Sequence, residues 1–285
     1  MYRILLLALL AAPLVVLPAD VQAQTARQAR GEVEASMLVT GHVDIDREGR
    51  VTAHTLDRQD DLPDYVVDLV GNTIAGLAFE PVVDQGQPAL ARAKMSLRLV
   101  AAQADDGKMT VRVRSAHFGE EYSEDDATSV RYANMRPPRY PDDVLRMGGK
   151  GTVYLLLKVG RDGGVEDVLA EQVNLTALGN ARQMETVRTR LADAAVKGAR
   201  NWTFTPPTEG EAAGKEHWVI RVPVEYTLGG DRETAYGQWA AYHPGTRHSP
   251  DWARPTPAGF SPDALMAGGV TPETSRFKLL TPLGG

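Results

Sequence analysis

Asp44, Asp46 and Glu48, followed by Gly49, imitate the start of a calcium-binding loop. Carboxylates at alternate positions before a glycine supply the oxygen ligands that Ca2+ prefers. A complete loop also needs a bidentate glutamate at its twelfth position, and that position is Thr55. We therefore interpret the stretch as a strand that ends in a glycine turn, and we predict no metal site.

A second stretch, from Gly148 to Thr152, has the glycines and the lysine of a phosphate-binding loop. That motif places Ser or Thr directly after the lysine and another glycine earlier at a fixed spacing. Here Gly151 follows the lysine, and the earlier glycine is missing. The stretch is better explained as the flexible start of a strand.

The remaining reactive residue types form no recognisable catalytic arrangement. His243, His248 and Asp251 lie close together, but their spacing matches no common zinc pattern. The chain has no cysteine and no Gly-x-Ser-x-Gly nucleophile elbow. Its acidic residues are too numerous and too scattered for an acid/base pair to be picked out. We predict that the protein is not an enzyme and needs no cofactor.

The composition is that of an ordinary globular protein. Hydrophobic residues make up 43% and charged residues 24% of the 285 residues, which is usual for folded domains. This length allows one or two domains with cores of their own. A net charge of −6 argues against nucleic acid as the partner, and nothing in the sequence indicates a small-molecule substrate.

The N-terminal segment Met1–Ala23 has the pattern of a signal peptide. Arg3 supplies the positive start, and Ile4–Pro18 is an apolar run of about fifteen residues. A helix needs roughly twenty apolar residues to cross a membrane. We expect export with cleavage near Ala23, followed by a short linker over residues 24–30. The alternative is an inner-membrane protein that retains this segment as its anchor and exposes a periplasmic domain.

Between Arg136 and Leu228 the hydrophobic pattern predicts a small α+β unit. Residues 151–159 alternate as in a strand, and Asp162-Gly163 favours the positive φ of a tight hairpin turn. A helical stripe that would cover the hairpin follows, made of Val187, Leu191, Ala194, Ala195, Gly198 and Trp202. We interpret the large aromatic residues Trp202, Phe204 and Trp218 as core residues rather than as a binding surface.

The closing strand of this unit, residues 220–226, has two different faces. The residues expected in the core are Ile220, Val222, Val224 and Tyr226, and those expected opposite are Arg221, Pro223 and Glu225. Because Pro223 has no N–H, the strand is expected at a sheet edge, with that position facing away from its neighbour. Such an edge can accept an extended peptide as an additional strand.

The order of these elements resembles the C-terminal domain of the TonB energy-transducer family. That order is Arg-Tyr-Pro, a short helix, a Gly-Thr-Val strand, an Asp-Gly turn, a helix, Trp-x-Phe-x-Pro and a Val-Pro-Val strand. The resemblance covers about a third of the chain. The matching positions are Tyr140, Pro141, Gly151, Val153, Gly163, Val165, Trp202, Phe204, Pro206, Val222 and Pro223.

The resemblance implies a protein-binding domain without catalytic residues, in the periplasm of a Gram-negative bacterium. Its last strand would pair with an extended segment of an outer-membrane receptor or of a periplasmic or inner-membrane complex, which links it to outer-membrane transport. The residues implied for this contact are Ile220, Arg221, Val222, Val224, Glu225 and Tyr226. Arg136, Arg139 and Tyr140 either pack the start of the domain or contact the partner, and the sequence leaves both open.

Residues 31–116 repeat the same order in a weaker form. Val43–Val51 aligns with Leu157–Val165, and Leu77–Pro81 echoes Trp202–Pro206. We therefore predict two tandem TonB-C-like modules in an α+β fold. Each module would be a three-stranded antiparallel sheet with helical cover. The alternative is an unrelated α+β segment that matches by coincidence.

The predicted organisation assigns residues 31–116 to a degenerate module and 135–229 to the TonB C-terminal-like domain. Residues 117–134 are expected to be an acidic linker, and residues 108–114 to add one more strand. The Pro/Gly-rich segment 230–285 is expected to be an irregular tail. Four aromatic residues predict that part of this tail docks against a domain: Trp239, Tyr242, Trp252 and Phe260.

Three functions remain open from the sequence. The leading hypothesis is periplasmic protein binding by edge-strand pairing. The alternative is a membrane-anchored energy transducer for TonB-dependent transport, which requires Met1–Ala23 to stay attached. An enzyme with an unrecognised site is the third, and no group of residues supports it.

Overall fold

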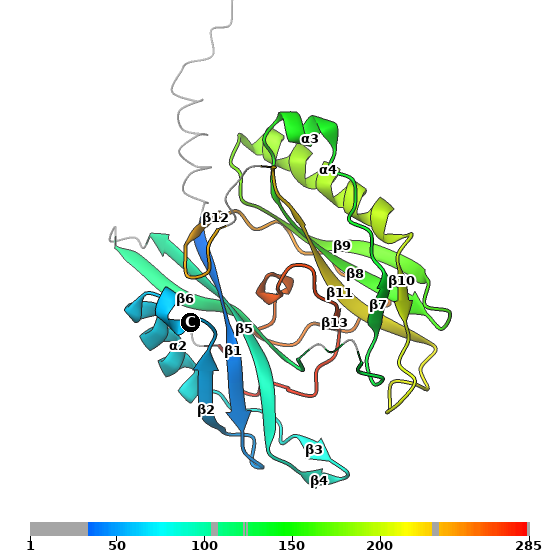
Figure 1. The fold of residues 1–285 in the computed structure, drawn as a ribbon. Coiled ribbons are helices and arrows are strands. Elements are labelled where there is room, and N and C mark those ends of the chain that lie inside the picture. Colours follow the sequence, from blue (N-terminus) through cyan, green and yellow to red (C-terminus); the bar gives the residue numbers. More distant parts are fainter. Residues whose placement is uncertain (1–33, 104–107, 122, 124, 230–233, 284–285) are drawn as a thin grey trace, which may run out of the picture.

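The computed structural model describes residues 34–103, 108–121, 123, 125–229 and 234–283. The fold is mixed α+β with antiparallel sheets and few helices, which confirms the predicted fold class. Two main sheets face each other, each with a helix on its outer side, and the C-terminal tail passes between them (Figure 1). The predicted signal peptide and linker lie outside the described residues. Among the helices that are described, none is long and apolar enough to cross a membrane.

The first sheet has the strand order β12-β1-β5-β6, and β2 also pairs with β1. Its elements are β1 (Glu34–Ile45), β2 (Val51–Leu56), helix α2 (Asp64–Ala75), β5 (Ala91–Gln103), β6 (Met109–Gly119) and β12 (Ala240–Tyr242). A 3-10 turn (Gln59–Asp61) precedes the helix, and a small hairpin of β3 (Val83–Asp84) and β4 (Gln87–Pro88) follows it. Helix α2 buries Val66, Val70 and Ile74, whose spacing places them on one face.

The second sheet has the strand order β13-β11-β8-β9. Its elements are β8 (Gly151–Gly160), β9 (Val165–Leu175), helix α4 (Ala181–Ala199), β11 (His217–Tyr226) and β13 (Thr271–Pro272). The short helix α3 (Asp142–Arg146) precedes β8, and β10 (Thr203–Thr205) pairs separately with β7 (Arg131–Asn134). The predicted hairpin, helix and closing strand are therefore confirmed.

Helix α4 begins at a capping box. The side chain of Asn180 accepts a hydrogen bond from the Gln183 N–H at 2.9 Å, and the Asn180 N–H donates to Gln183 Oε1 at 3.1 Å. The helix packs on the sheet through one buried face, made of Met184, Val187, Leu191, Ala195 and Ala199. Together with β8 and β11 this face encloses the core of the second sheet.

Each hairpin turn is held by the phenylalanine segment that follows the helix. Gly163 has φ +80°, and its carbonyl oxygen accepts a hydrogen bond from the Phe204 N–H at 2.8 Å. Gly49 has φ +84°, and its carbonyl oxygen accepts from the Phe79 N–H at the same distance. At both turns, a Cβ on the glycine would overlap the carbonyl oxygen of that phenylalanine. The same local arrangement therefore occurs twice in the chain.

Each sheet contains more strands than the three predicted for its module. The strand predicted over residues 108–114 is confirmed as β6, but it continues to Gly119, inside the predicted linker. The tail contributes β12 to the first sheet and β13 to the second. The physical reason is that the edge of a small sheet exposes unpaired N–H and C=O groups, and these segments pair with them.

The tail joins the two sheets rather than covering one of them. After β12 pairs with β1, the next residue, His243, exchanges two backbone hydrogen bonds with Leu175 at the end of β9, at 2.9 and 3.0 Å. Farther along, Phe277 is buried in the core of the first sheet, and Leu279 pairs with Phe79. The predicted docking of the tail is confirmed, because Tyr242 is buried as well.

Buried polar side chains lie where the tail passes between the sheets. Asp263, in a short 3-10 helix (Pro262–Ala264), is fully buried. Its carboxylate accepts hydrogen bonds from Ser115 Oγ at 2.7 Å and from the Tyr242 hydroxyl. Its backbone carbonyl accepts from Arg98 Nε at 2.8 Å. Because a buried carboxylate without donors is unfavourable, these donors fix the position of this part of the tail.

Candidate functional site

The outer side of β11 is where the sequence analysis predicts that a partner strand binds. On its inner side, β11 pairs with β8 along its whole length, from His217 opposite Gly160 to Tyr226 opposite Gly151. The backbone groups of successive residues in a strand point to alternate sides. The carbonyls of Val219 and Pro223 accept hydrogen bonds from the tail. It follows that every second residue of β11, from Val219 to Glu225, directs its backbone groups outward.

This geometry agrees with the prediction made from Pro223. The ring of Pro223 removes an N–H from the outer side, where it costs no bond to β8. However, β11 is not the outermost strand, because β13 pairs with it there. The sequence analysis missed this pairing, since Thr271–Pro272 is too short to show an alternating pattern.

The contact between β13 and β11 is brief. Two residue pairs are in register, Ile220 with Pro272 and Arg221 with Thr271. The Glu273 N–H donates to the Val219 carbonyl at 2.9 Å, and the Gly268 N–H donates to the Pro223 carbonyl at 3.2 Å. Between them, the side chain of Val270 is buried in the core of the second sheet. The tail segment Gly268–Glu273 thus already occupies part of the outer side of β11.

The side chains predicted to contact a partner are mostly occupied inside the protein. Ile220, Val222 and Tyr226 are buried in the core, and Val224 is half-buried against it. Arg221 is buried on the opposite face, and Glu225 is exposed. What β11 can offer to a partner over this stretch is therefore mainly its backbone.

The second group of predicted contact residues lies at the start of the domain. The Tyr140 ring packs edge to face on the Tyr226 ring, with centroids 5.3 Å apart, and its hydroxyl donates to the Gly149 carbonyl. The Arg136 carbonyl accepts from Trp202 Nε1 at 2.8 Å. Arg139 forms an exposed ion pair with Asp142 at 3.0 Å. Tyr140 thus has a packing role, whereas the Arg139 side chain faces solvent.

The aromatic residues interpreted as core residues are confirmed as such. Trp202, Phe204 and Trp218 are buried in the core of the second sheet.

The calcium-like stretch forms a turn, as interpreted. Asp46 Oδ1 accepts hydrogen bonds from the Arg50 N–H at 2.7 Å and from the Glu48 N–H at 3.0 Å. The bond from the Arg50 N–H is the main cause of the lowered pKa of Asp46. In the part of the chain that the structure describes, no three metal-ligating side chains converge.

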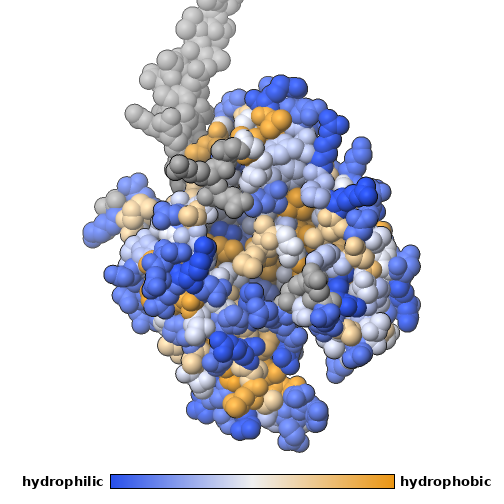
Figure 2. Space-filling model, in the orientation of Figure 1, coloured by the Kyte–Doolittle hydropathy of each residue, from blue (hydrophilic) through white to orange (hydrophobic). Residues whose placement is uncertain are grey.

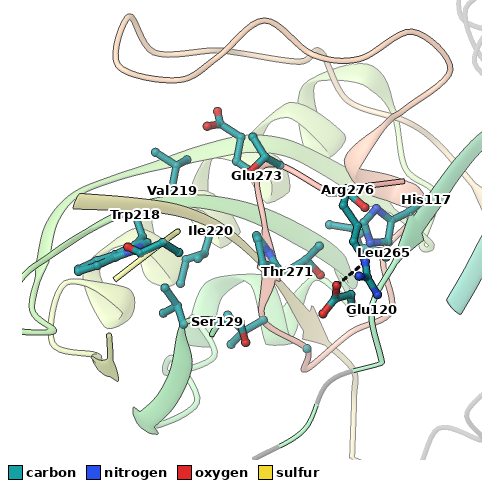
Figure 3. A pocket seen from close by; sticks show the side chains of 18 of the residues that line it. His117, Glu120, Ser129, Trp218, Val219, Ile220, Leu265, Thr271, Glu273 and Arg276 are labelled. Atoms are coloured by element: carbon teal, nitrogen blue, oxygen red, sulfur yellow. Dashed lines mark hydrogen bonds and ion pairs between the residues drawn. The ribbon is translucent and has the colours of Figure 1, made fainter. Parts of the chain in front are cut away.

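A cavity of about 420 Å3 opens beside the ladder of β11 and β13 (Figure 3). The apolar side chains of Trp218, Ile220 and Leu265 line one part of it. An ion pair between Arg276 and Glu120, at 2.7 Å, borders another part. Figure 2 shows the molecule in the orientation of Figure 1. Apolar residues gather near the centre of this view, between the two sheets, whereas much of the periphery is hydrophilic. Side chains of a strand bound along β11 would therefore lie next to unfilled, partly apolar space.

On the face of β11 opposite to Ile220 and Val222, a buried ion pair connects the strand to β9 and to the tail. Glu171 is 1% exposed and Arg221 3% exposed; Arg221 Nε lies 2.7 Å from Glu171 Oε2. Arg247 of the tail also binds this carboxylate, with its Nε 2.9 Å from Oε1. The Arg221 guanidinium lies over the Phe260 ring, 4.9 Å from its centroid. The sequence showed no sign of this cluster, because its members lie far apart in the chain.

His117 of β6 faces the same cluster from the first sheet. Its imidazole packs edge to face on Phe260, with centroids 5.9 Å apart. Burial, and secondarily the positive charge of Arg221, lower the pKa of His117 from 6.5 to about 4. In the unfolded chain the His117 imidazole binds a proton with a pKa near 6.5, whereas in the folded protein it binds one only at a lower pH. The folded state therefore loses stability as the pH falls from about 6.5 to about 4, and the effect is absent above this range.

We expect the free energy of unfolding to fall by about 2 kcal/mol between pH 7 and pH 4, because His117 takes up a proton more readily in the unfolded chain than in the folded protein. The full pKa change corresponds to about 3 kcal/mol, and we expect less because the ring borders a cavity open to solvent. Urea unfolding of the protein and of His117→Gln across this pH range measures the difference. His54→Gln, on the exposed part of β2, is the control. Parallel pH profiles for the protein and His117→Gln would contradict the expectation.

Comparison with known proteins supports a TonB-like relationship for part of the chain. A stretch of 102 residues is 30% identical to a Pseudomonas aeruginosa protein named tonB2. This stretch makes up 36% of the chain, and it spans about a third, 33%, of the length of that relative. No family model matches the chain, and no solved structure shows significant similarity to it.

Proposed function

We propose that the protein is a periplasmic binding protein of the TonB type that serves outer-membrane transport. It would recognise an extended segment of a partner protein by strand pairing along the outer side of β11. One observation carries this proposal: this side already accepts an antiparallel strand, β13, through main-chain hydrogen bonds. The partial similarity to tonB2 supports it. The contact is a protein-binding one, so we propose no catalytic residue, metal or cofactor.

We further propose that the chain contains two TonB-C-like modules, within residues 31–116 and 135–229. The order β2-β1-β5 in the first sheet matches the order β9-β8-β11 in the second. In both, a helix follows the hairpin, and a Phe-x-Pro segment then binds the hairpin glycine. A coincidental α+β segment would not require this shared hydrogen bond.

The two modules differ in how their closing strands are covered. Strand β5, the counterpart of β11, pairs with β6 in a register that runs from Lys94 opposite Gly119 to Gln103 opposite Met109. Among the described residues, the corresponding side of β11 carries the two register pairs made by β13 and no others. A partner strand would have to displace the long strand β6 from β5 in the first module, but only the short strand β13 from β11 in the second. We therefore assign partner binding to the second module.

The location is part of the proposal. We propose that Met1–Ala23 is a cleaved signal peptide and that the protein acts in the periplasm of a Gram-negative bacterium. A membrane-anchored energy transducer is the second candidate, because the similarity is to a TonB protein. Cell fractionation followed by intact mass separates them: a membrane-bound species that begins at Met1 would favour the transducer.

We expect Glu225→Pro to reduce partner binding by at least about tenfold, whereas Glu225→Ala leaves it nearly unchanged. The side chain of Glu225 is exposed, but its backbone points outward, and main-chain hydrogen bonds supply the affinity of strand addition. The measurement is photocrosslinking to the partner in the cell that naturally makes the protein. The photoreactive residue replaces Val219, whose backbone also lies on the outer side of β11. A photoreactive residue at Thr189, exposed on α4, is the control.

Neighbouring positions make this test specific. Val224 directs its N–H toward β8, so Val224→Pro would damage the sheet itself and cannot serve as the test. Thermal unfolding of Glu225→Pro should match that of Glu225→Ala, because an outer position tolerates proline. Equal crosslink yields for the two variants would show that β11 does not bind the partner through its backbone.

A further inference from the structure

The tail segment Gly268–Glu273 lies on the side of β11 that the proposed function requires. We propose that this segment is a displaceable internal strand: it covers the partner site in the free protein, and the partner binds by replacing it in the same antiparallel register. This inference rests on the proposed function, and it adds how the site is regulated and what kind of segment it accepts.

The contacts of the segment are few enough for it to leave. It makes two register pairs with β11, whereas β8 pairs with β11 along the whole strand. Gly268 has φ +78°, and a Cβ there would meet nothing within 4 Å, so this end of the segment is loosely surrounded. Val270 is the one side chain of Gly268–Glu273 that is buried in the core. Detachment therefore breaks a few hydrogen bonds and exposes one side chain of moderate size.

The parts of the tail on either side of the segment are anchored much more firmly. On the N-terminal side, Asp263 is fully buried and bound by Ser115 and Tyr242. On the C-terminal side, Phe277 is buried in the core of the first sheet. The segment can thus detach as a loop between two fixed points while the rest of the tail stays in place. Such local opening is a usual property of weakly contacted segments.

The segment also shows which partner chemistry fits. The Glu273 N–H donates to the Val219 carbonyl, so the backbone of the preceding residue, Pro272, points away from β11 and needs no N–H. Thr271 lies opposite the buried Arg221. A replacing strand should therefore carry an apolar residue at the place of Val270, a small polar residue next, and any residue, proline included, after it.

A partner must bind better than a segment of the same chain, which is always present at a high effective concentration. The cavity beside the ladder supplies the required difference. Trp218 and Leu265 line it together with Val270, so it adjoins the one buried side chain of the segment. A segment with a larger apolar side chain, such as Phe, at this place would bury surface that valine leaves uncovered. We infer that the partner presents a larger apolar residue there.

The test uses two variants of the full protein with opposite effects on the segment. Thr271→Pro removes an N–H that faces β11 and should release the segment; Pro272→Ala, at the outward position, is its matched control. Val219→Cys with Glu273→Cys should lock it, because the bond from the Glu273 N–H to the Val219 carbonyl, 2.9 Å long, holds the two backbones close enough for a disulfide. The chain has no other cysteine, so the disulfide is the only one that can form.

The probe is a fluorescent peptide with the sequence of residues 266–275, in which Phe replaces Val270. We expect Thr271→Pro to bind it at least about tenfold more tightly than the unaltered protein and Pro272→Ala to bind it equally. The oxidised double-cysteine variant should bind at least about tenfold more weakly than its reduced form. Each single-cysteine variant should show no response to reductant. Equal affinity of the released and the locked protein for the peptide would overturn the inference.

Crosslinking in cells separates this inference from the proposed function. A photoreactive residue at Glu225 of the double-cysteine variant should crosslink the partner only after reduction. If the crosslink forms equally in the oxidised protein, strand pairing survives but displacement of the tail segment is wrong. If no partner is crosslinked from β11 in either state while the peptide affinities follow the expected order, the segment is displaceable and the proposed function is wrong.

Discussion

Replacing Glu171 with alanine will lower the free energy of unfolding by about 3–5 kcal/mol. The side chain is 1% exposed, and its carboxylate is the partner of Arg221, which is 3% exposed. Removing one member of a buried ion pair leaves an uncompensated buried charge, which costs about this much. Arg247, whose side chain is 28% exposed, also loses this partner, but it can turn to solvent. Urea unfolding followed by circular dichroism measures the change.

Glu166, on the same strand, is the matched control for Glu171. It forms an ion pair with Lys158 at 3.0 Å, but its side chain is 46% exposed. Exposed pairs contribute about 0–1 kcal/mol, so Glu166→Ala should have a small effect. A double variant, Glu171→Leu with Arg221→Met, should recover much of the loss, because replacing a whole buried pair by apolar residues is often neutral. Similar losses for Glu171→Ala and Glu166→Ala would show that burial does not decide the effect.

Gly163→Ala will lower the free energy of unfolding by about 3 kcal/mol. An alanine at φ +80° costs about 1 kcal/mol in backbone strain. Its Cβ would also overlap the Phe204 carbonyl oxygen, and shifting this packed backbone costs about 2 kcal/mol more. The same urea unfolding experiment measures the loss.

Gly86 separates the two contributions. It has the same φ, +80°, in the small hairpin of β3 and β4, but a Cβ there would meet nothing within 4 Å. Gly86→Ala should therefore cost only about 1 kcal/mol. Gly49→Ala, at the turn between β1 and β2 in the first sheet, should cost about as much as Gly163→Ala, because its Cβ would overlap the Phe79 carbonyl oxygen. A loss at Gly49 as small as that at Gly86 would remove this support for the duplication.

The elements that the sequence determined by itself are those with a local signal. Asp162-Gly163 identified the hairpin of β8 and β9, because a positive φ at this turn favours glycine. The apolar stripe that includes Val187 and Leu191 identified α4, because helical spacing puts these residues on one face. Pro223 identified the outer side of β11, because a residue without an N–H fits where no bond to β8 is needed.

The tertiary structure alone decided what covers these elements. Thr271–Pro272 pairs with β11 through backbone hydrogen bonds, which leave no pattern in such a short sequence. Arg221 and Glu171 are 50 residues apart and meet only because β11 and β9 lie on either side of β8. Ser115 and Asp263 are 148 residues apart and meet only because the tail passes between the two sheets. In the sequence each of these polar residues looks like an ordinary surface residue. Only folding removes them from water, and their hydrogen-bond partners make that burial possible.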